Sequence, residues 1–159
     1  MVAPETITSI EQQAFSNCSN LVSTSLPSSI TSIGSYAFDK CSKLALTSLP
    51  SGVTSIPDTC FRNTKLALTS LPSGITSIGS GAFNGCSYLA ITEIPSGVTF
   101  IGDHAFYYCT GLTEITFLGT PTTIQNDCFG GCSSLTTIYV PWSIGAVAGS
   151  PWGAVNASI

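Results

Sequence analysis

The chain has 159 residues, which predicts one domain with a sizeable core; 43% of the residues are hydrophobic and only 8% charged, so 24 serines and 20 threonines must supply most of the polar surface. The formal net charge of −4, with four basic residues in all, disfavours binding to nucleic acids, and no apolar run is long enough for a membrane-spanning helix. A single histidine, His104, and few acidic residues leave little material for acid–base catalysis.

The first predicted element is an incomplete repeat unit at the N-terminus. Ala3–Ile10 aligns with Leu26–Ile33, so the chain begins immediately after the position of a strand. No residue before Ile7 could cover the open end of a stack, where apolar side chains and strand edges would be exposed. We therefore expect either a fragment of a longer protein or self-association through this uncapped N-terminal coil. No signal peptide is recognised in this chain.

The main body of the chain is a repeat of about 23 residues. Six phenylalanines recur at intervals of 23, 23, 22, 23 and 23 residues, and six leucines follow them in step. A coil of this length cannot bury its apolar side chains alone, whereas stacked coils place like side chains in continuous columns. The pattern predicts a repeat solenoid, mainly β, of about six coils, whose columns are Phe15, Phe38, Phe61, Phe83, Phe106 and Phe129, and Leu21, Leu44, Leu66, Leu89, Leu112 and Leu135.

Each coil contains two predicted extended segments separated by a turn. A β-branched segment such as Ile30–Ile33 comes first, and a glycine then bends the chain into an Ala-Phe-x-x-Cys turn, for which the spacing suggests one tight helical turn. A short strand such as Leu112–Phe117 follows, with alternate residues on one face. In most coils it ends at a proline, which cannot donate to a sheet ladder.

The repeat resembles the BspA-like class of leucine-rich repeats, as in Ile78–Leu89, and the match extends from about Ile7 to Pro141. The resemblance implies a right-handed solenoid with a parallel sheet on its concave face and short turns or 3-10 helices on its convex side. It also implies a bacterial surface or secreted protein that binds molecules of a host or a neighbouring cell, with no catalytic residues. The chain departs from the pattern at Pro57, Cys60, Thr64 and Cys128.

The predicted organisation is a solenoid over residues 1–141 and a C-terminal capping segment over residues 142–159. The capping segment leaves the repeat and carries Trp142 and Trp152 among small residues.

The seven cysteines are interpreted as buried free thiols. Five occupy the third position after the repeat phenylalanine, where equivalent side chains point in parallel, which is poor geometry for disulfides. The chain has no Cys-x-x-Cys pair, so no metal site is predicted, and no cofactor is expected either. His104 occupies a variable position and is predicted to face solvent.

A partner is expected to bind the concave face through the third and fifth positions of the strand, with the repeat leucine counted as the first. The candidate binding residues are Leu46, Leu68, Ile91, Glu93, Glu114 and Tyr139. Strict alternation would expose Leu46, Leu68 and Ile91 as an apolar stripe, which favours an interaction site. The alternative is a bulge or register shift that turns these three side chains inward and the neighbouring threonines outward.

All four basic residues lie in two adjacent coils and form a candidate basic patch of Lys40, Lys43, Arg62 and Lys65, which either orients the rod on a charged partner or is ordinary surface charge. The sequence predicts a non-catalytic recognition or adhesion module of a bacterial surface or secreted protein, with a protein or glycan ligand. The alternative is a structural, self-assembling element, such as a fibre or virion appendage, built by end-to-end stacking of coils.

Overall fold

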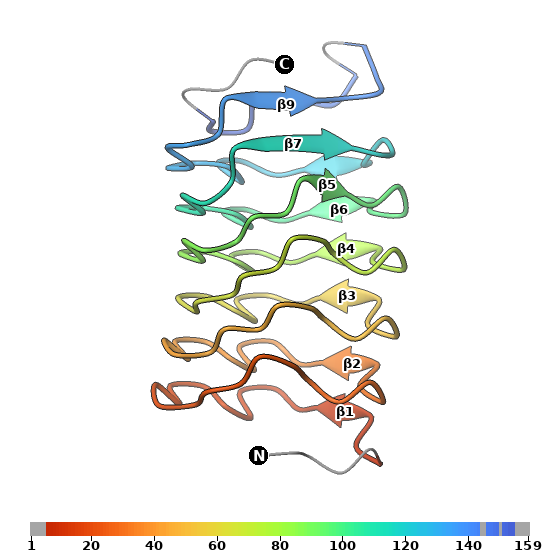
Figure 1. The fold of residues 1–159 in the computed structure, drawn as a ribbon. Helices are drawn as coiled ribbons and strands as arrows, with labels where there is room; N and C mark the ends of the chain where they lie inside the picture. Colours follow the sequence, from red (N-terminus) through yellow and green to blue (C-terminus); the bar gives the residue numbers. More distant parts are fainter. Residues whose placement is uncertain (1–5, 144–145, 150, 155–159) are drawn as a thin grey trace.

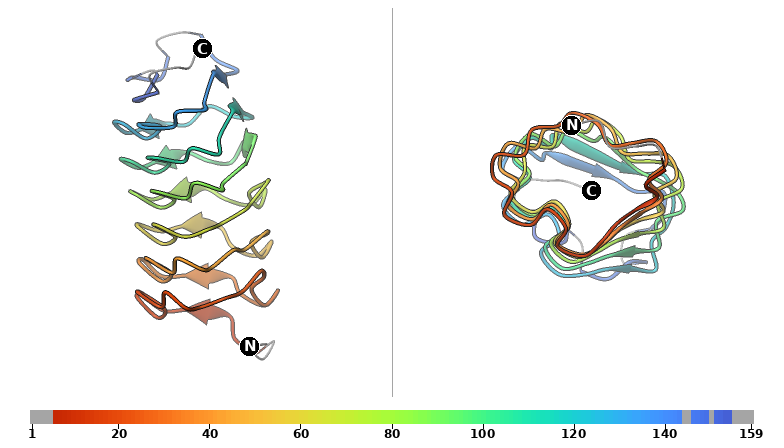
Figure 2. Two further views of the ribbon diagram at one scale, coloured as in Figure 1. Left: turned by 60° about the vertical axis from the view of Figure 1, so that its left-hand side comes forward. Right: turned by 90° about the horizontal axis from the view of Figure 1, so that it is seen from below.

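The computed structural model describes residues 6–143, 146–149 and 151–154. The chain winds into about six coils stacked one above another (Figure 1), and viewed along the stack the coils nearly superimpose in one closed outline (Figure 2). The described residues form short strands and turns, with no helix. The strands are β1 (Ser9–Ile10), β2 (Ser32–Ile33), β3 (Ser55–Ile56), β4 (Ser77–Ile78), β5 (Glu93–Ile94), β6 (Phe100–Ile101), β7 (Glu114–Phe117), β8 (Thr123–Ile124) and β9 (Thr137–Tyr139).

The column of aromatic rings confirms the stacking predicted from the repeat. The six repeat phenylalanines lie ring on ring, with centroids 5.3 to 5.9 Å apart and interplanar angles of 15° or less. The five from Phe38 onward are at most 1% exposed, and so are the repeat leucines from Leu44 onward. Burial of each such side chain contributes about 1.5 to 3 kcal/mol, so both columns stabilise the rod.

The β-branched segments form two parallel sheets rather than one. β1 pairs with β2, and β3, β4, β6 and β8 pair in that order, with equivalent residues of successive coils opposite each other. The break between β2 and β3 lies beside Pro57. In the coils of Gly34, Gly79 and Gly102 the residue at this position donates its amide to the isoleucine carbonyl of the preceding coil. Proline has no amide hydrogen, so this rung of the ladder cannot form at Pro57.

The third sheet is shorter than the sequence predicts. It contains β5, β7 and β9, which come from the segments that follow the repeat leucines of the last three coils. We call the seven residues from each repeat leucine the Leu segment: 21–27, 44–50, 66–72, 89–95, 112–118 and 135–141. The first three Leu segments contain no strand, so the expected continuous parallel sheet extends over only half of the stack.

The Ala-Phe-x-x-Cys turns are not 3-10 helices. Each contains two residues with left-handed backbone, four positions apart, such as Tyr36 and Lys40 with φ of 59° each. Amide groups therefore alternate in direction. Phe38 donates to Cys60 in the next coil, whereas Ala37 donates to Gly34 of its own turn. The turns thus form a ladder of their own between coils, which a helical turn would not provide.

The cysteine column consists of free thiols, as predicted, and all of them except the exposed Cys18 are buried. Four thiols lie 3.0 Å from the carbonyl oxygen of the repeat phenylalanine of the preceding coil; they are Cys41, Cys86, Cys109 and Cys132. At Thr64, which replaces the repeat cysteine, the hydroxyl donates instead to Phe61 of its own coil. Burial raises the pKa of Cys86 to about 11, so this thiol stays protonated and inert near neutral pH.

The two ends of the stack are covered differently. At the C-terminal end Trp152 is 2% exposed, lies 6.1 Å from Phe117 between ring centroids, and accepts a backbone hydrogen bond from Phe129 through its carbonyl. Trp142 also lies against Phe117, at 5.2 Å. Residues 144–145, 150 and 155–159 of the predicted capping segment lie outside the described part. At the N-terminal end Phe15 remains 38% exposed.

Candidate binding surface

The outward face of the Leu segments is built from hydroxyl side chains. Thr47, Thr69 and Thr92 at the fourth position are exposed, and so are Ser48 and Ser70 at the fifth. Of the two interpretations left open for the third position, the exposed apolar stripe is wrong, because Leu46, Leu68 and Ile91 are at most 1% exposed. The alternative interpretation, in which these side chains turn inward and the threonines outward, is the correct one.

Leu46, Leu68 and Ile91 lie inside because the buried positions of the Leu segment differ between the earlier and the later coils. In the second to fourth coils the first, third and sixth residues are buried, as with Leu66, Leu68 and Leu71. Two consecutive residues, Thr69 and Ser70, therefore face outward, and the two-residue alternation of a strand is interrupted.

In the last two coils the fourth residue replaces the third as the buried one. Ile115 and Phe117 are buried at the fourth and sixth positions, which restores the alternation and permits the four-residue strand β7. Glu114, at the third position, then points to solvent.

The other three candidate residues, Glu93, Glu114 and Tyr139, are exposed on the sheet of β5, β7 and β9. Glu93 lies opposite Thr116, which lies opposite Tyr139, so these three residues form one row across the sheet. Glu114 lies opposite Thr137 in the neighbouring row. Because residues two apart in a strand share a face, both carboxylates and the 53% exposed tyrosine project from the same side.

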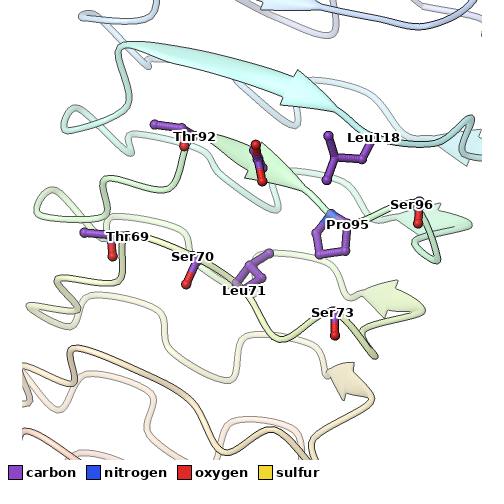
Figure 3. Close-up of a pocket in the computed structure, with 9 residues that line it drawn as sticks. Thr69, Ser70, Leu71, Ser73, Thr92, Pro95, Ser96 and Leu118 are labelled. Atoms are coloured by element: carbon purple, nitrogen blue, oxygen red, sulfur yellow. The ribbon is translucent and has the colours of Figure 1, made fainter.

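A groove of about 320 Å³ lies on this face between the Leu segments of the third and fourth coils. Its floor is apolar, formed by Leu71, Pro95 and Leu118, as Figure 3 shows. Around it stand hydroxyl groups and one carboxylate, from Thr69, Ser70, Ser73, Thr92, Ser96 and Glu93.

The ladder between the two Leu segments that border the groove is interrupted. Ala90 donates its amide to the Leu68 carbonyl, but in the described structure no backbone hydrogen bond joins Thr69–Ser73 to Thr92–Ser96. In the next gap up the stack the ladder resumes, since Thr116 donates to Thr92 and Leu118 to Ile94. The two segments are therefore free to separate at the surface.

This groove was not predicted from the sequence, although one residue signals it. Leu118 occupies the position at which all five other Leu segments carry proline, and it is 50% exposed. A large apolar side chain exposed where the repeat specifies a turn proline marks a departure from the common coil.

The candidate basic residues are brought near one another but are partly neutralised. Arg62 donates to both carboxylate oxygens of Asp39 at 2.8 and 2.9 Å, and these hydrogen bonds raise the pKa of its guanidinium. Lys43 donates to Asn20 at 2.9 Å, and the Lys65 ammonium lies 6.0 Å from the ring centroid of Tyr88. Lys40 is exposed. Within the described coils Arg62 is therefore held in an ion pair with Asp39, so its charge is not free at the surface.

In the described part of the chain no group of three or more His, Cys, Asp or Glu side chains could hold a metal ion. His104 is exposed, as predicted, and lies edge-on to Tyr107 with ring centroids 4.9 Å apart. Among the described residues, no helix has the length and apolar character needed to cross a bilayer.

A second surface lies at the N-terminal end of the stack. It is a mainly apolar hollow of about 270 Å³, lined by the first two coils. Phe15 and Ile7 there are about two-fifths exposed and Val22 is 67% exposed. Phe15 and Ile7 belong to columns that are buried in every coil further along, whereas the position of Val22 is never buried in the later coils and is exposed at Ala90 and Thr113.

Comparison with known proteins identifies similar repeats and structures. The sequence model of the BspA type leucine rich repeat region matches six copies, over residues 1–111 and 54–150. No curated protein matches the chain.

Three solved structures are similar over most of this chain. A leucine-rich repeat protein from Bacteroides ovatus is 33% identical, with a TM-score of 0.67 over 83% of this chain and 34% of its own. The T. pallidum leucine rich repeat protein is 33% identical, with a TM-score of 0.68 over 84% and 63%. A leucine rich cell surface protein from Faecalibacterium prausnitzii is 27% identical, with a TM-score of 0.64 over 84% and 45%. The chain thus spans between one third and two thirds of the length of these proteins.

Proposed function

Because the chain belongs to the BspA-type leucine-rich repeat family, we propose that it is a non-catalytic protein-interaction module that binds its partner on the face carrying Glu93, Glu114 and Tyr139. The observation that carries the proposal is the groove on this face. Its hydroxyl and carboxylate side chains form no hydrogen bond within the described part of the chain. Polar groups in this state are available to a ligand, and the rigid stack holds them at fixed spacing.

We further propose that the module belongs to a bacterial surface or secreted protein and serves adhesion. The similar protein from Faecalibacterium prausnitzii is described as a cell surface protein, which supports this location. A surface rich in serine and threonine and poor in charge suits contact with protein or glycan ligands outside the cell.

The experiment is a selection of binders from a displayed random-peptide library on the immobilised chain. Retained peptides are then tested on a face variant, Glu93→Gln with Glu114→Gln and Tyr139→Ala, and on a matched control, Ser55→Ala with Ser77→Ala and Thr123→Ala. The control alters outward residues of the sheet containing β3, β4 and β8. We expect enriched peptides to lose binding to the face variant only. Enrichment that is unaffected by the face variant, or lost equally in the control, would contradict the proposed surface.

Self-association is the second candidate function, and the apolar hollow at the N-terminal end favours it. Burying Ile7 and Phe15 against a second copy would remove water from side chains whose equivalents are exposed only in the first coil, and would also cover the 67% exposed Val22. Phe129, near the other end, is already covered by Trp152. Contact through the N-terminal coils therefore favours pairs of rods over an extended filament.

Sedimentation velocity over a hundredfold range of concentration tests this second function. A concentration-dependent pair that disappears in Phe15→Ser with Val22→Ser supports it. A chain that sediments as a monomer at every concentration would contradict self-association. Continuous filaments in electron micrographs would instead support assembly in series and contradict pairing.

A further inference from the structure

Resting on the proposed interaction function, we propose that the groove between the third and fourth coils binds an extended peptide in which a lysine or arginine stands beside apolar residues. The peptide backbone would pair with the open edge of β5, its apolar side chains would cover the groove floor, and its cation would meet Glu93.

The hydrogen bonds of β5 leave one edge of this strand open to a peptide backbone. β5 is the edge strand of its sheet, and the carbonyls of Thr92 and Ile94 both accept hydrogen bonds from the next coil, at 2.8 and 3.0 Å. In a parallel ladder alternate residues point their amide and carbonyl groups to opposite sides, so those of Glu93 point toward the groove. No backbone bond crosses the groove between the described residues of the two segments. An unpaired edge of this kind is the element to which extended peptides add.

The apolar floor provides the affinity that one or two backbone bonds lack. Leu118 is 50% exposed at the upper side of the floor, whereas Leu71 and Pro95 are buried beneath it. A valine or leucine side chain laid across Leu118 would bury apolar surface on both molecules, at about 25 cal/mol per Å².

The negative charge beside the groove favours a cationic segment as the ligand. Glu93 is the one charged residue that lines the groove, and Glu114 projects from the same face of the adjacent strand. The four basic residues of the chain lie in the turn regions that precede the third and second Leu segments, and none lines the groove. A lysine or arginine of the partner would thus meet a carboxylate that has no partner of its own in the described structure.

The hydroxyl groups favour a peptide over a sugar. At the fourth position of the Leu segment Thr47 donates its hydroxyl to the carbonyl of Thr24 at 3.3 Å, whereas the hydroxyls of Thr69 and Thr92 form no such bond in the described structure. They are free to bond with peptide amides and carbonyls. The groove has no aromatic ring on which a sugar could stack, since its floor is leucine and proline.

The probe is the peptide acetyl-Thr-Val-Lys-Val-Thr-amide, titrated into the isotopically labelled chain and followed by amide chemical shifts. We expect saturable shifts confined to Thr69–Ser73, Thr92–Ser96 and Leu118. Replacing the peptide lysine by glutamate should weaken binding at least fivefold, and methylating the backbone nitrogen of that lysine should do the same because it removes a strand donor.

Two chain variants and one control complete the test. Glu93→Gln and Leu118→Ser change exposed side chains, so both should fold, which thermal unfolding verifies, and each should weaken binding at least threefold. Ser55→Ala should leave binding unchanged. Shifts spread away from the groove, equal binding of the glutamate peptide, equal binding of the methylated peptide, or displacement by maltoheptaose at equal concentration would overturn the inference.

Different experimental results would contradict this inference and the proposed function. Library binders that depend on the face but lack a basic residue would leave the interaction function standing and overturn this inference. A library that yields no binder dependent on the face would instead contradict the interaction function itself, whatever the probe peptide does.

Discussion

The second to fourth coils and the last two coils share one repeat length but differ in how the Leu segment enters the core. In the earlier coils the third residue is inside, as Leu68 is, and no four-residue strand forms. In the later coils the fourth residue is inside, as Ile115 is, and β7 and β9 form. A shift of the buried residue by one position therefore decides whether the outward face is a regular sheet. The groove lies beside the place where the two types meet.

The largest expected effect comes from truncating the inward third position. Leu68→Ala should lower the free energy of unfolding by about 2 to 5 kcal/mol, because it leaves a cavity in the leucine column. Glu114→Ala, at the third position of the fifth coil, should change it by less than about 0.5 kcal/mol because the side chain is exposed. Urea unfolding measures both. Equal losses would show that the two regions bury the same position.

The two regions share the cysteine column, and unfolding at alkaline pH tests how much its protonated thiols contribute to stability. Burial raises the pKa of Cys86 from 9.0 to about 11, so this thiol contributes stability that is complete below about pH 9 and is lost as the pH rises through 11. The loss from this thiol should approach about 2 to 3 kcal/mol at full ionisation. Urea unfolding from pH 8 to 11 should show a shallower decline for Cys86→Ala than for the unmodified chain. The exposed Cys18→Ala serves as control, and parallel pH profiles for all three proteins would contradict the prediction.

Converting one type of coil into the other tests the comparison directly. Ile115→Thr alone should cost about 1 to 3 kcal/mol, since it removes buried carbon and buries a hydroxyl. Adding Glu114→Leu should recover at least about 1 kcal/mol, because the segment then carries the inward leucine and outward threonine of the earlier coils.

A double-mutant cycle from urea unfolding measures this recovery, and faster amide exchange over Glu114–Phe117 should accompany it. The control pairs Ile115→Thr with Ser25→Leu in the first coil, where the two effects should add. If the changes in unfolding free energy caused by Ile115→Thr and Glu114→Leu also simply add, then the third residue has not replaced the fourth in the core.

The smallest expected effect concerns the turns, which have the same backbone in both regions. Lys40 has a φ of 59°, at the position where Gly85 and Gly131 stand in later coils. Lys40→Gly should raise stability by up to about 1 kcal/mol, because relief of the left-handed strain exceeds the conformational entropy that glycine loses. Lys43→Gly, at a residue outside the left-handed set, should lower it by a similar amount. Thermal unfolding distinguishes the two signs, and destabilisation by both variants would contradict the argument.

The repeat period alone was sufficient to predict the stack, the phenylalanine and leucine columns and the free thiols, because a periodic sequence can bury its apolar side chains only in register. The turn conformation could not be predicted, since the Phe-x-x-Cys spacing fits a helical turn as well as a turn with two left-handed residues. The break in the first ladder follows from Pro57 once the amide of that position is known to bond to the preceding coil.

The candidate surface was predicted less well. Glu93, Glu114 and Tyr139 were correctly placed on the outside, but Leu46, Leu68 and Ile91 were left open between solvent and core. By itself, then, the sequence determined which side chains stack and how often. Only the tertiary structure decided which residue of each Leu segment turns inward and where two segments separate, because both depend on contacts between coils that a single repeat does not contain.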